Sequence, residues 1–157
     1  MTTGNSVPNI QTTEGQAQLK AMGIKPVPVP DEVTGPYWAS AKKHQLQLQY
    51  CTACSDFQHP PFATCRRCGG TSLEWRDISG KGTIYSFIID HRLMTPGFSE
   101  PYAVVQVNPV EAKSDTVRIT TNMRECELKD VKIGMAVEVV FEDVNDTVTL
   151  PQFRPAK

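Results

Sequence analysis

Four of the five cysteines in this 157-residue chain form two pairs, and two residues separate the members of each pair. The pairs are Cys51 with Cys54, in CTAC, and Cys65 with Cys68, in CRRC. Two tight turns of this kind can present four thiolates at the corners of a tetrahedron, the geometry that Zn²⁺ prefers. Because four cysteines leave no open position for water, the pattern predicts a structural zinc site without catalytic chemistry.

Other chemistries also fit a Cys-x-x-Cys pair, namely a redox dithiol, an iron site of the rubredoxin type and a disulfide. Zinc is favoured because a ribbon of this size buries too little apolar surface to fold alone, and a structural zinc ion supplies on the order of 10 kcal/mol. His59 lies between the pairs and is expected to be a loop residue, since four thiolates already complete the shell. Cys126 is expected to have no catalytic role, because the sequence shows no base or oxyanion pocket to accompany it.

A helix and a strand are predicted just before the ribbon. Residues 34–45 are typical of a helix, because Pro36 suits an early helical position and Tyr37 and Trp38 put apolar bulk on one side. The segment QLQLQYC then alternates apolar residues with glutamines, which predicts a strand that leads into the first cysteine pair.

The chain after Gly80 is rich in β-branched and aromatic residues. Its candidate strands are GTIYSFIIDH, YAVVQV, TVRITT, AVEVVFEDV and TVTL. Five short strands, a glycine-bearing entry and a polar break at residues 127–132 favour a five-stranded OB-fold barrel, with a compact immunoglobulin-like sheet pair as the alternative. The aromatic residues Trp75, Tyr85, Phe87 and Phe141 are expected to fill the barrel core and its junction with the ribbon.

These elements predict a mainly β protein in three parts. Residues 1–33 are expected to form an extended N-terminal arm, because alternate prolines near its end favour an extended path, with one short helix possible at residues 14–22. Residues 34–79 are expected to hold the helix and the ribbon, and residues 80–157 the OB-fold domain.

Charge and hydropathy exclude some classes of protein. There are 16 Lys and Arg against 17 Asp and Glu, so a net charge of −1 gives no global attraction to nucleic acid or anionic lipid. No apolar stretch is long enough to span a bilayer, and the polar N-terminal segment lacks the apolar middle of a secretory signal. A cytoplasmic protein is therefore expected.

The order of these segments resembles a family catalogued as domain of unknown function 35 (DUF35), which joins a rubredoxin-like zinc ribbon to an OB fold. The similar segments are Tyr37–Trp38, LQLQYCTAC, HPPFATCRRCGG, LEWRDISGKGTIYSFIIDHR, PYAVVQV, DVKIGMAVEVVFEDV and LPQFRP. The resemblance implies an accessory subunit of a thiolase-superfamily enzyme that processes acyl-CoA, since members bind such enzymes and some are joined to acyl-CoA hydratases. In that case the partner supplies the catalytic residues and this chain helps to form the acyl-CoA channel.

Two sets of contact residues follow from this expectation. Basic residues that could reach the phosphates of CoA are Lys81, His91, Arg92 and Arg118. Apolar residues that could contact the partner are Tyr37, Trp38, Met94 and Phe98, the last two in a loop bent by proline and glycine. The alternatives are a single-stranded nucleic-acid module, which the acidic balance of the barrel disfavours, and a self-sufficient thioesterase or acyltransferase that uses Cys126 or His91.

Overall fold

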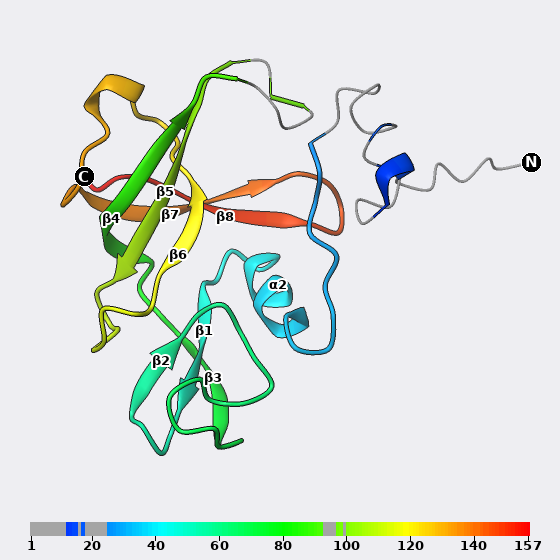
Figure 1. Ribbon diagram of the computed structural model, residues 1–157, viewed down its shortest axis with the longest axis vertical. Helices are drawn as coiled ribbons and strands as arrows, with labels where there is room; N and C mark the ends of the chain where they lie inside the picture. The colour runs from blue at the N-terminus through cyan, green and yellow to red at the C-terminus, as the bar shows by residue number, and fades with distance from the viewer. Residues whose placement is uncertain (1–11, 16, 18–24, 93–96, 99) are drawn as a thin grey trace, which may run out of the picture. The chain divides into compact units, whose positions relative to one another are not determined.

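The computed structural model describes residues 12–15, 17, 25–92, 97–98 and 100–157 (Figure 1). The chain divides into two compact units, one formed by residues 1–28 and 90–101 and the other by residues 29–89 and 102–157. In the smaller unit the Lys25 ammonium lies 4.7 Å from the centre of the Phe98 ring. Most of the helix expected at residues 14–22 lies outside the described residues, as does Met94. No helix in the described part of the chain is long and apolar enough to cross a bilayer.

The helix before the ribbon is α2, Gly35–Ala41, and it is shorter than the sequence indicates. Asp31 stabilises the turn that leads into this helix, because one of its carboxylate oxygens accepts hydrogen bonds from the backbone N–H groups of Val33 and Thr34. The helix ends early because the chain turns back: the Ser40 hydroxyl donates to the carbonyl of Gln45 at 2.7 Å, and His44 takes a left-handed conformation with φ of 56°.

The cysteine ribbon contains a three-stranded antiparallel sheet. Its strands are β1 (Gln47–Cys51), β2 (Asp56–Gln58) and β3 (Leu73–Asp77), in the order β2-β1-β3. Cys51 pairs with Asp56 on one side and with Leu73 on the other. Strand β1 confirms the strand predicted in QLQLQYC, but its burial does not alternate as expected, because Gln49 is buried and Tyr50 is only half-buried. Strands β2 and β3 were not predicted.

The second sheet has five antiparallel strands. They are β4 (Lys81–Asp90), β5 (Tyr102–Pro109), β6 (Ile119–Asn122), β7 (Ala136–Asp143) and β8 (Thr149–Pro155), in the order β6-β5-β4-β7-β8. The polar break before β7 contains a 3₁₀ turn, Leu128–Asp130.

The two edges of this sheet meet, as an OB-fold barrel requires. A parallel bridge joins Met123 to Phe153, and the N–H of Arg124 donates to the carbonyl of Phe153 at 2.7 Å. The Thr121 hydroxyl donates to the carbonyl of Pro151 at 2.7 Å. The mainly β, OB-like fold class is thereby confirmed.

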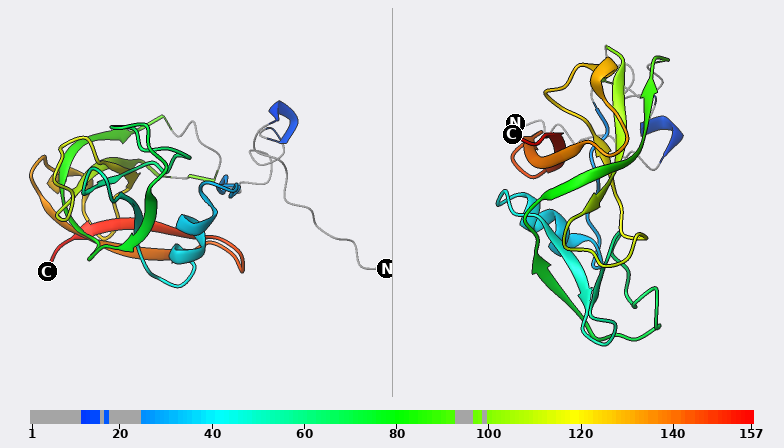
Figure 2. Two further views of the ribbon diagram at one scale, coloured as in Figure 1. Left: turned by 90° about the horizontal axis from the view of Figure 1, so that it is seen from below. Right: turned by 90° about the vertical axis from the view of Figure 1, so that its left-hand side faces the viewer.

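Within the larger unit the ribbon strands and α2 lie next to the barrel strands (Figure 2), and buried residues of all three form one hydrophobic core. Tyr37 and Leu48 join barrel residues such as Ile84, Val105 and Phe153 in this core. Trp75, Phe87 and Phe141 pack against it as expected. The expectation for Tyr85 is wrong, because its side chain is 47% exposed on the outside of β4.

Candidate metal centre

The four paired cysteines converge at one end of the ribbon. Cys51 ends β1, Cys54 lies in the following turn, and Cys65 and Cys68 come from the loop between β2 and β3. Their sulfur atoms all lie within 4.8 Å of one another. The two closest pairs given by the structure are Cys51 with Cys68 and Cys54 with Cys65, each at 3.8 Å.

Each pair sits on a turn that a left-handed residue closes. Ser55 follows the first pair with φ of 52°, and Gly69 follows the second with φ of 74°. The tight turns point backbone N–H groups at sulfur: Cys54 donates to Cys51 Sγ and Arg67 donates to Cys65 Sγ, both at 3.4 Å. Such N–H groups stabilise thiolates, which are the form that binds a metal ion.

The electrostatics of the sulfur cluster favour a bound cation when all four thiols are ionised. The backbone N–H groups of Cys68 and Arg67 lower the pKa of Cys65 to about 6. The neighbouring side chain of Cys68, together with burial, raises the pKa of Cys54 to about 12. Four adjacent sulfurs cannot all be ionised without a balancing positive charge, because like charges at this distance repel.

The donor set and its spacing fit Zn²⁺. Four ligands about 2.3 Å from zinc at the corners of a tetrahedron lie about 3.8 Å apart, and the two sulfur pairs have this separation. In the part of the chain that the structure describes, no other cluster of three or more His, Cys, Asp or Glu side chains is found.

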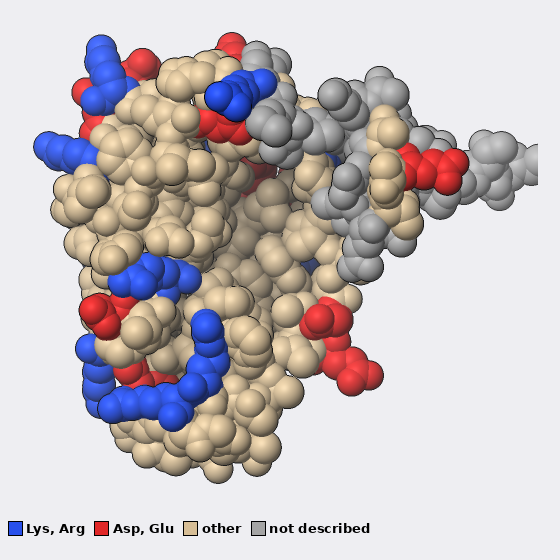
Figure 3. All heavy atoms as spheres, viewed as in Figure 1, with Lys and Arg blue, Asp and Glu red and all other residues tan. Residues whose placement is uncertain are grey.

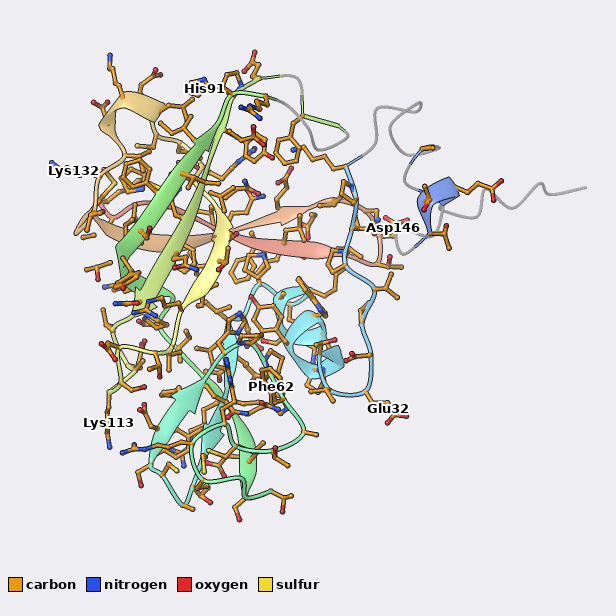
Figure 4. All side chains as sticks on the ribbon, in the orientation of Figure 1. Glu32, Phe62, His91, Lys113, Lys132 and Asp146 are labelled. Atoms are coloured by element: carbon orange, nitrogen blue, oxygen red, sulfur yellow. The ribbon has the colours of Figure 1, made fainter. Side chains whose placement is uncertain are left out.

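A network of buried amides holds the loop between the cysteine pairs (Figure 4, where Phe62 is labelled). Gln49 Oε1 accepts from the side chain of Gln58 at 2.7 Å and from the N–H of Phe62 at 2.8 Å. Gln58 Oε1 accepts from the N–H of Arg66 at 2.9 Å, one residue after Cys65. Sequence reasoning missed this role, because the glutamines of β1 indicate only the polar half of an alternating strand.

His59 lies in the same loop but is separate from the sulfur cluster. Its ring centre is 5.3 Å from that of Tyr37, and burial lowers its pKa to about 4. Its Nδ1 is buried and has no hydrogen-bond partner among the described residues. A pocket of about 420 Å³ is lined by His59 and three of the cysteines, and also by Ser114, Thr116 and Val117.

The other candidate residues are divided between the two units. Lys81 begins β4 and Arg118 immediately precedes β6, both in the larger unit, while His91 and Arg92 belong to the smaller unit. Tyr37 is buried in the chain's own core, Trp38 packs against that core, and Phe98 is half-buried.

Comparison with known proteins agrees with this architecture. Residues 38–74 match a family model described as the rubredoxin-like zinc ribbon domain of ChsH2, and residues 75–142 match its C-terminal OB-fold domain. A chain of the solved Ltp2-ChsH2(DUF35) aldolase is 32% identical, with a TM-score of 0.74 over 83% of this chain and 99% of that chain. The chain belongs to the ChsH2 (DUF35) family.

Two curated relatives of this ChsH2-family chain have different lengths. A probable enoyl-CoA hydratase alpha subunit of Thermomonospora curvata is 31% identical over 90% of this chain, which spans only 43% of that relative. A DUF35 domain-containing scaffold protein of Methanocaldococcus jannaschii is 29% identical over 80% of this chain and 87% of its own length. The ribbon and barrel therefore occur both as a short scaffold protein and as part of a longer subunit.

Proposed function

We propose that this ChsH2-family chain is a non-catalytic accessory subunit of a thiolase-like, acyl-CoA-processing complex. The observation that carries the proposal is its likeness to nearly the whole DUF35 chain of a two-component aldolase. Relatives named as an enoyl-CoA hydratase subunit and as a scaffold protein support the same role. The partner supplies the reacting groups, and this chain stabilises the partner and helps to form the acyl-CoA channel.

The chemistry of the cysteines supports a structural role. Cys51, Cys54, Cys65 and Cys68 would hold one zinc ion in a closed shell of four sulfurs, which leaves no position for substrate or water. The ion would fix the end of β1, the turn after it and the loop before β3, and so keep the ribbon packed against the barrel. The environment of Cys126 disfavours the nucleophilic thiolate, because burial and the nearby Asp130 and Glu127 raise the pKa of its thiol.

Contact with CoA belongs to the same proposal. Lys81, His91 and Arg92 are exposed and could meet its phosphates once the partner is bound. Arg118 differs from them, because its guanidinium is stacked on Tyr85.

Reconstitution tests the proposed function. The tagged full-length chain is purified from its own organism, and the proteins that copurify are identified by mass spectrometry. We expect a thiolase-superfamily subunit, no acyl-CoA turnover by this chain alone, and turnover by the complex that exceeds that of the isolated partner. Robust turnover by the zinc-loaded chain alone, or the absence of any thiolase-like partner, would overturn the proposal.

A further inference from the structure

On the outer face of strands β4, β5 and β6, the strands themselves carry no charged residue between their two ends. We name this surface the neutral face; its members are Thr83, Tyr85 and Ile88 of β4, Val104, Gln106 and Asn108 of β5, and Thr120 and Asn122 of β6. The register pairs Val104 with Asn122 and Gln106 with Thr120, while the intervening Ala103, Val105 and Val107 point into the core. Figure 3 shows a broad area without Lys, Arg, Asp or Glu over these strands.

One guanidinium crosses this face. Arg118 immediately precedes β6, and its Cζ lies 3.6 Å from the centre of the Tyr85 ring on β4. Since β5 lies between β4 and β6 in the sheet, the arginine side chain reaches across β5 to stack on the tyrosine. Tyr85 is 47% exposed and Ile88 is 63% exposed, so the stack borders open apolar surface.

Two side-chain atoms lack hydrogen bonds, one on the neutral face and one in the arginine that crosses it. Arg118 Nε and Asn108 Oδ1 are both buried without a partner among the described residues. A buried donor or acceptor without a partner costs about 1–3 kcal/mol, so native proteins rarely leave such atoms unpaired. Arg118 as a whole is half-buried and its guanidinium is stacked on the exposed Tyr85, so this charged group lies at the edge of the neutral face.

The composition of the neutral face matches the core of a protein interface. Interface cores are depleted in Lys, Glu and Asp and enriched in Tyr and Arg, and these two residues often contribute most of the binding energy. A single-stranded nucleic acid brings one phosphate with each nucleotide, and a face with one guanidinium could neutralise few of them. A folded protein surface therefore fits this face better than a nucleic acid.

The size of the face argues against a second copy of this chain. Three strands spaced about 4.8 Å apart, with about 27 Å along β5, give a surface of roughly 400 Å². A standard interface buries roughly 800 Å² on each partner, so two neutral faces placed against each other would make a weak contact. A stable complex needs an occupant that extends beyond the face.

We propose that the neutral face is the docking surface for the catalytic partner subunit. The partner would place an uncharged, partly apolar surface over Tyr85 and Ile88 and present one carboxylate or carbonyl oxygen to Arg118. This inference rests on the proposed function and says which surface of the chain binds the catalytic partner.

The chain offers a matched control for the test. On the ribbon, Arg76 is stacked on Tyr50 with its Cζ 3.5 Å from the ring centre, so the same pair of residue types occurs on a different surface. The thiolase-superfamily subunit identified by copurification serves as the probe. Its dissociation constant is measured by calorimetry for the wild-type chain and for the Tyr85→Ala, Arg118→Gln and Arg76→Gln variants, with zinc content and melting temperature as checks on folding.

We expect Tyr85→Ala and Arg118→Gln each to weaken binding at least tenfold and Arg76→Gln to change it less than threefold. Hydrogen–deuterium exchange of the wild-type complex supplies a readout that needs no variant, and residues 83–88, 104–108 and 118–122 should become protected. A complex that leaves these segments unprotected, or variants that all bind alike, would overturn the docking surface while the proposed function stands.

Two further outcomes would show that the neutral face binds something other than the catalytic partner. A concentration-dependent dimer of the isolated chain that is lost in Tyr85→Ala would assign the face to a second copy. Salt-dependent binding to a thymidine oligonucleotide that is lost in the same variant would assign it to nucleic acid. The absence of a thiolase-like partner would overturn the proposed function and the docking surface together.

Discussion

The carboxylate of Asp56, in the ribbon, accepts a hydrogen bond from the backbone N–H of Ser114, in the loop before β6, at 3.1 Å. Its other oxygen accepts from the N–H of Lys113 at 3.0 Å (Lys113 is labelled in Figure 4). Asp56 is only 5% exposed, and it follows the cluster cysteine Cys54 along the turn that Ser55 closes. This carboxylate thus ties the metal-binding end of the ribbon to the barrel.

Replacing Asp56 should therefore loosen the ribbon from the barrel. Asp56→Asn places an amide N–H₂ where one N–H donor now finds an oxygen, so one backbone group loses its partner. We expect the free energy of unfolding to fall by about 1–3 kcal/mol, measured by urea denaturation of the zinc-loaded chain. Asp77→Asn, at an exposed position of β3, is the control and should change stability little. If the two variants were equally stable, the hydrogen bonds of Asp56 would not stabilise the attachment of the ribbon to the barrel.

If the four paired cysteines bind zinc, replacing one of them should lower the zinc content and the melting temperature, whereas replacing Cys126 should not. Cys68→Ser should reduce bound zinc well below one ion per chain and lower the melting temperature, because a hydroxyl is a poor substitute for a thiolate at zinc. Cys126→Ser should keep one zinc ion and a melting temperature close to that of the wild type, since its sulfur lies outside the cluster. Elemental analysis and calorimetry provide the measurements. A wild-type chain that is purified without any bound metal ion would refute the site.

The parts of the fold that sequence could predict are those with local signals. Ligand spacing is local, so the two cysteine pairs are enough to indicate the metal centre. Four of the barrel strands are likewise predictable, because strand composition and turn residues are local as well. The last strand, β8 (Thr149–Pro155), shares only two residues with the predicted segment TVTL, because its prolines hide a strand from composition alone. Partners distant in sequence give no such signal: nothing in the segment CSDF indicates that Asp56 binds the N–H groups of Lys113 and Ser114.

Tyr85 shows a different limit of sequence analysis. In β4 the buried positions Gly82 and Ile84 alternate with exposed Thr83 and Tyr85, but the residues that pack on the core further along are Phe87 and Ile89. The inward register therefore shifts by one residue within the strand. In the segment TIYSFIID apolar residues occupy both odd and even positions, so its sequence does not reveal which residues face outward.

The start of β4 predicts a steric effect. A Cβ atom on Gly82 would lie 2.5 Å from Val107 Cγ1 and 2.6 Å from the carbonyl oxygen of Asn108, so β4 and β5 could not keep their separation. We expect Gly82→Ala to destabilise the chain by about 1–3 kcal/mol in urea denaturation. Gly35→Ala is the control, because nothing lies within 4 Å of a Cβ there and alanine favours the helix. If Gly82→Ala were as stable as Gly35→Ala, the close approach of β4 and β5 would be wrong.

His59 predicts how stability depends on pH. Burial lowers the pKa of His59 to about 4, whereas an unfolded histidine has a pKa of about 6.5. The unfolded chain therefore takes up a proton first as the pH falls, so the contribution of this group is fully present above about pH 6.5 and is lost between about 6.5 and about 4. Between about pH 7.0 and about pH 5.5 the loss from His59 should be about 1 kcal/mol.

Urea denaturation of the zinc-loaded chain at these two pH values measures this loss. The His59→Gln variant should lack that part of the pH dependence, whereas His91→Gln, at an exposed position, should keep the wild-type slope. The narrow pH range limits loss of zinc, and metal content measured at both pH values excludes that cause. Identical slopes for His59→Gln and the wild type would mean that His59 is solvated in the folded chain, and would remove the packing of its ring beside Tyr37.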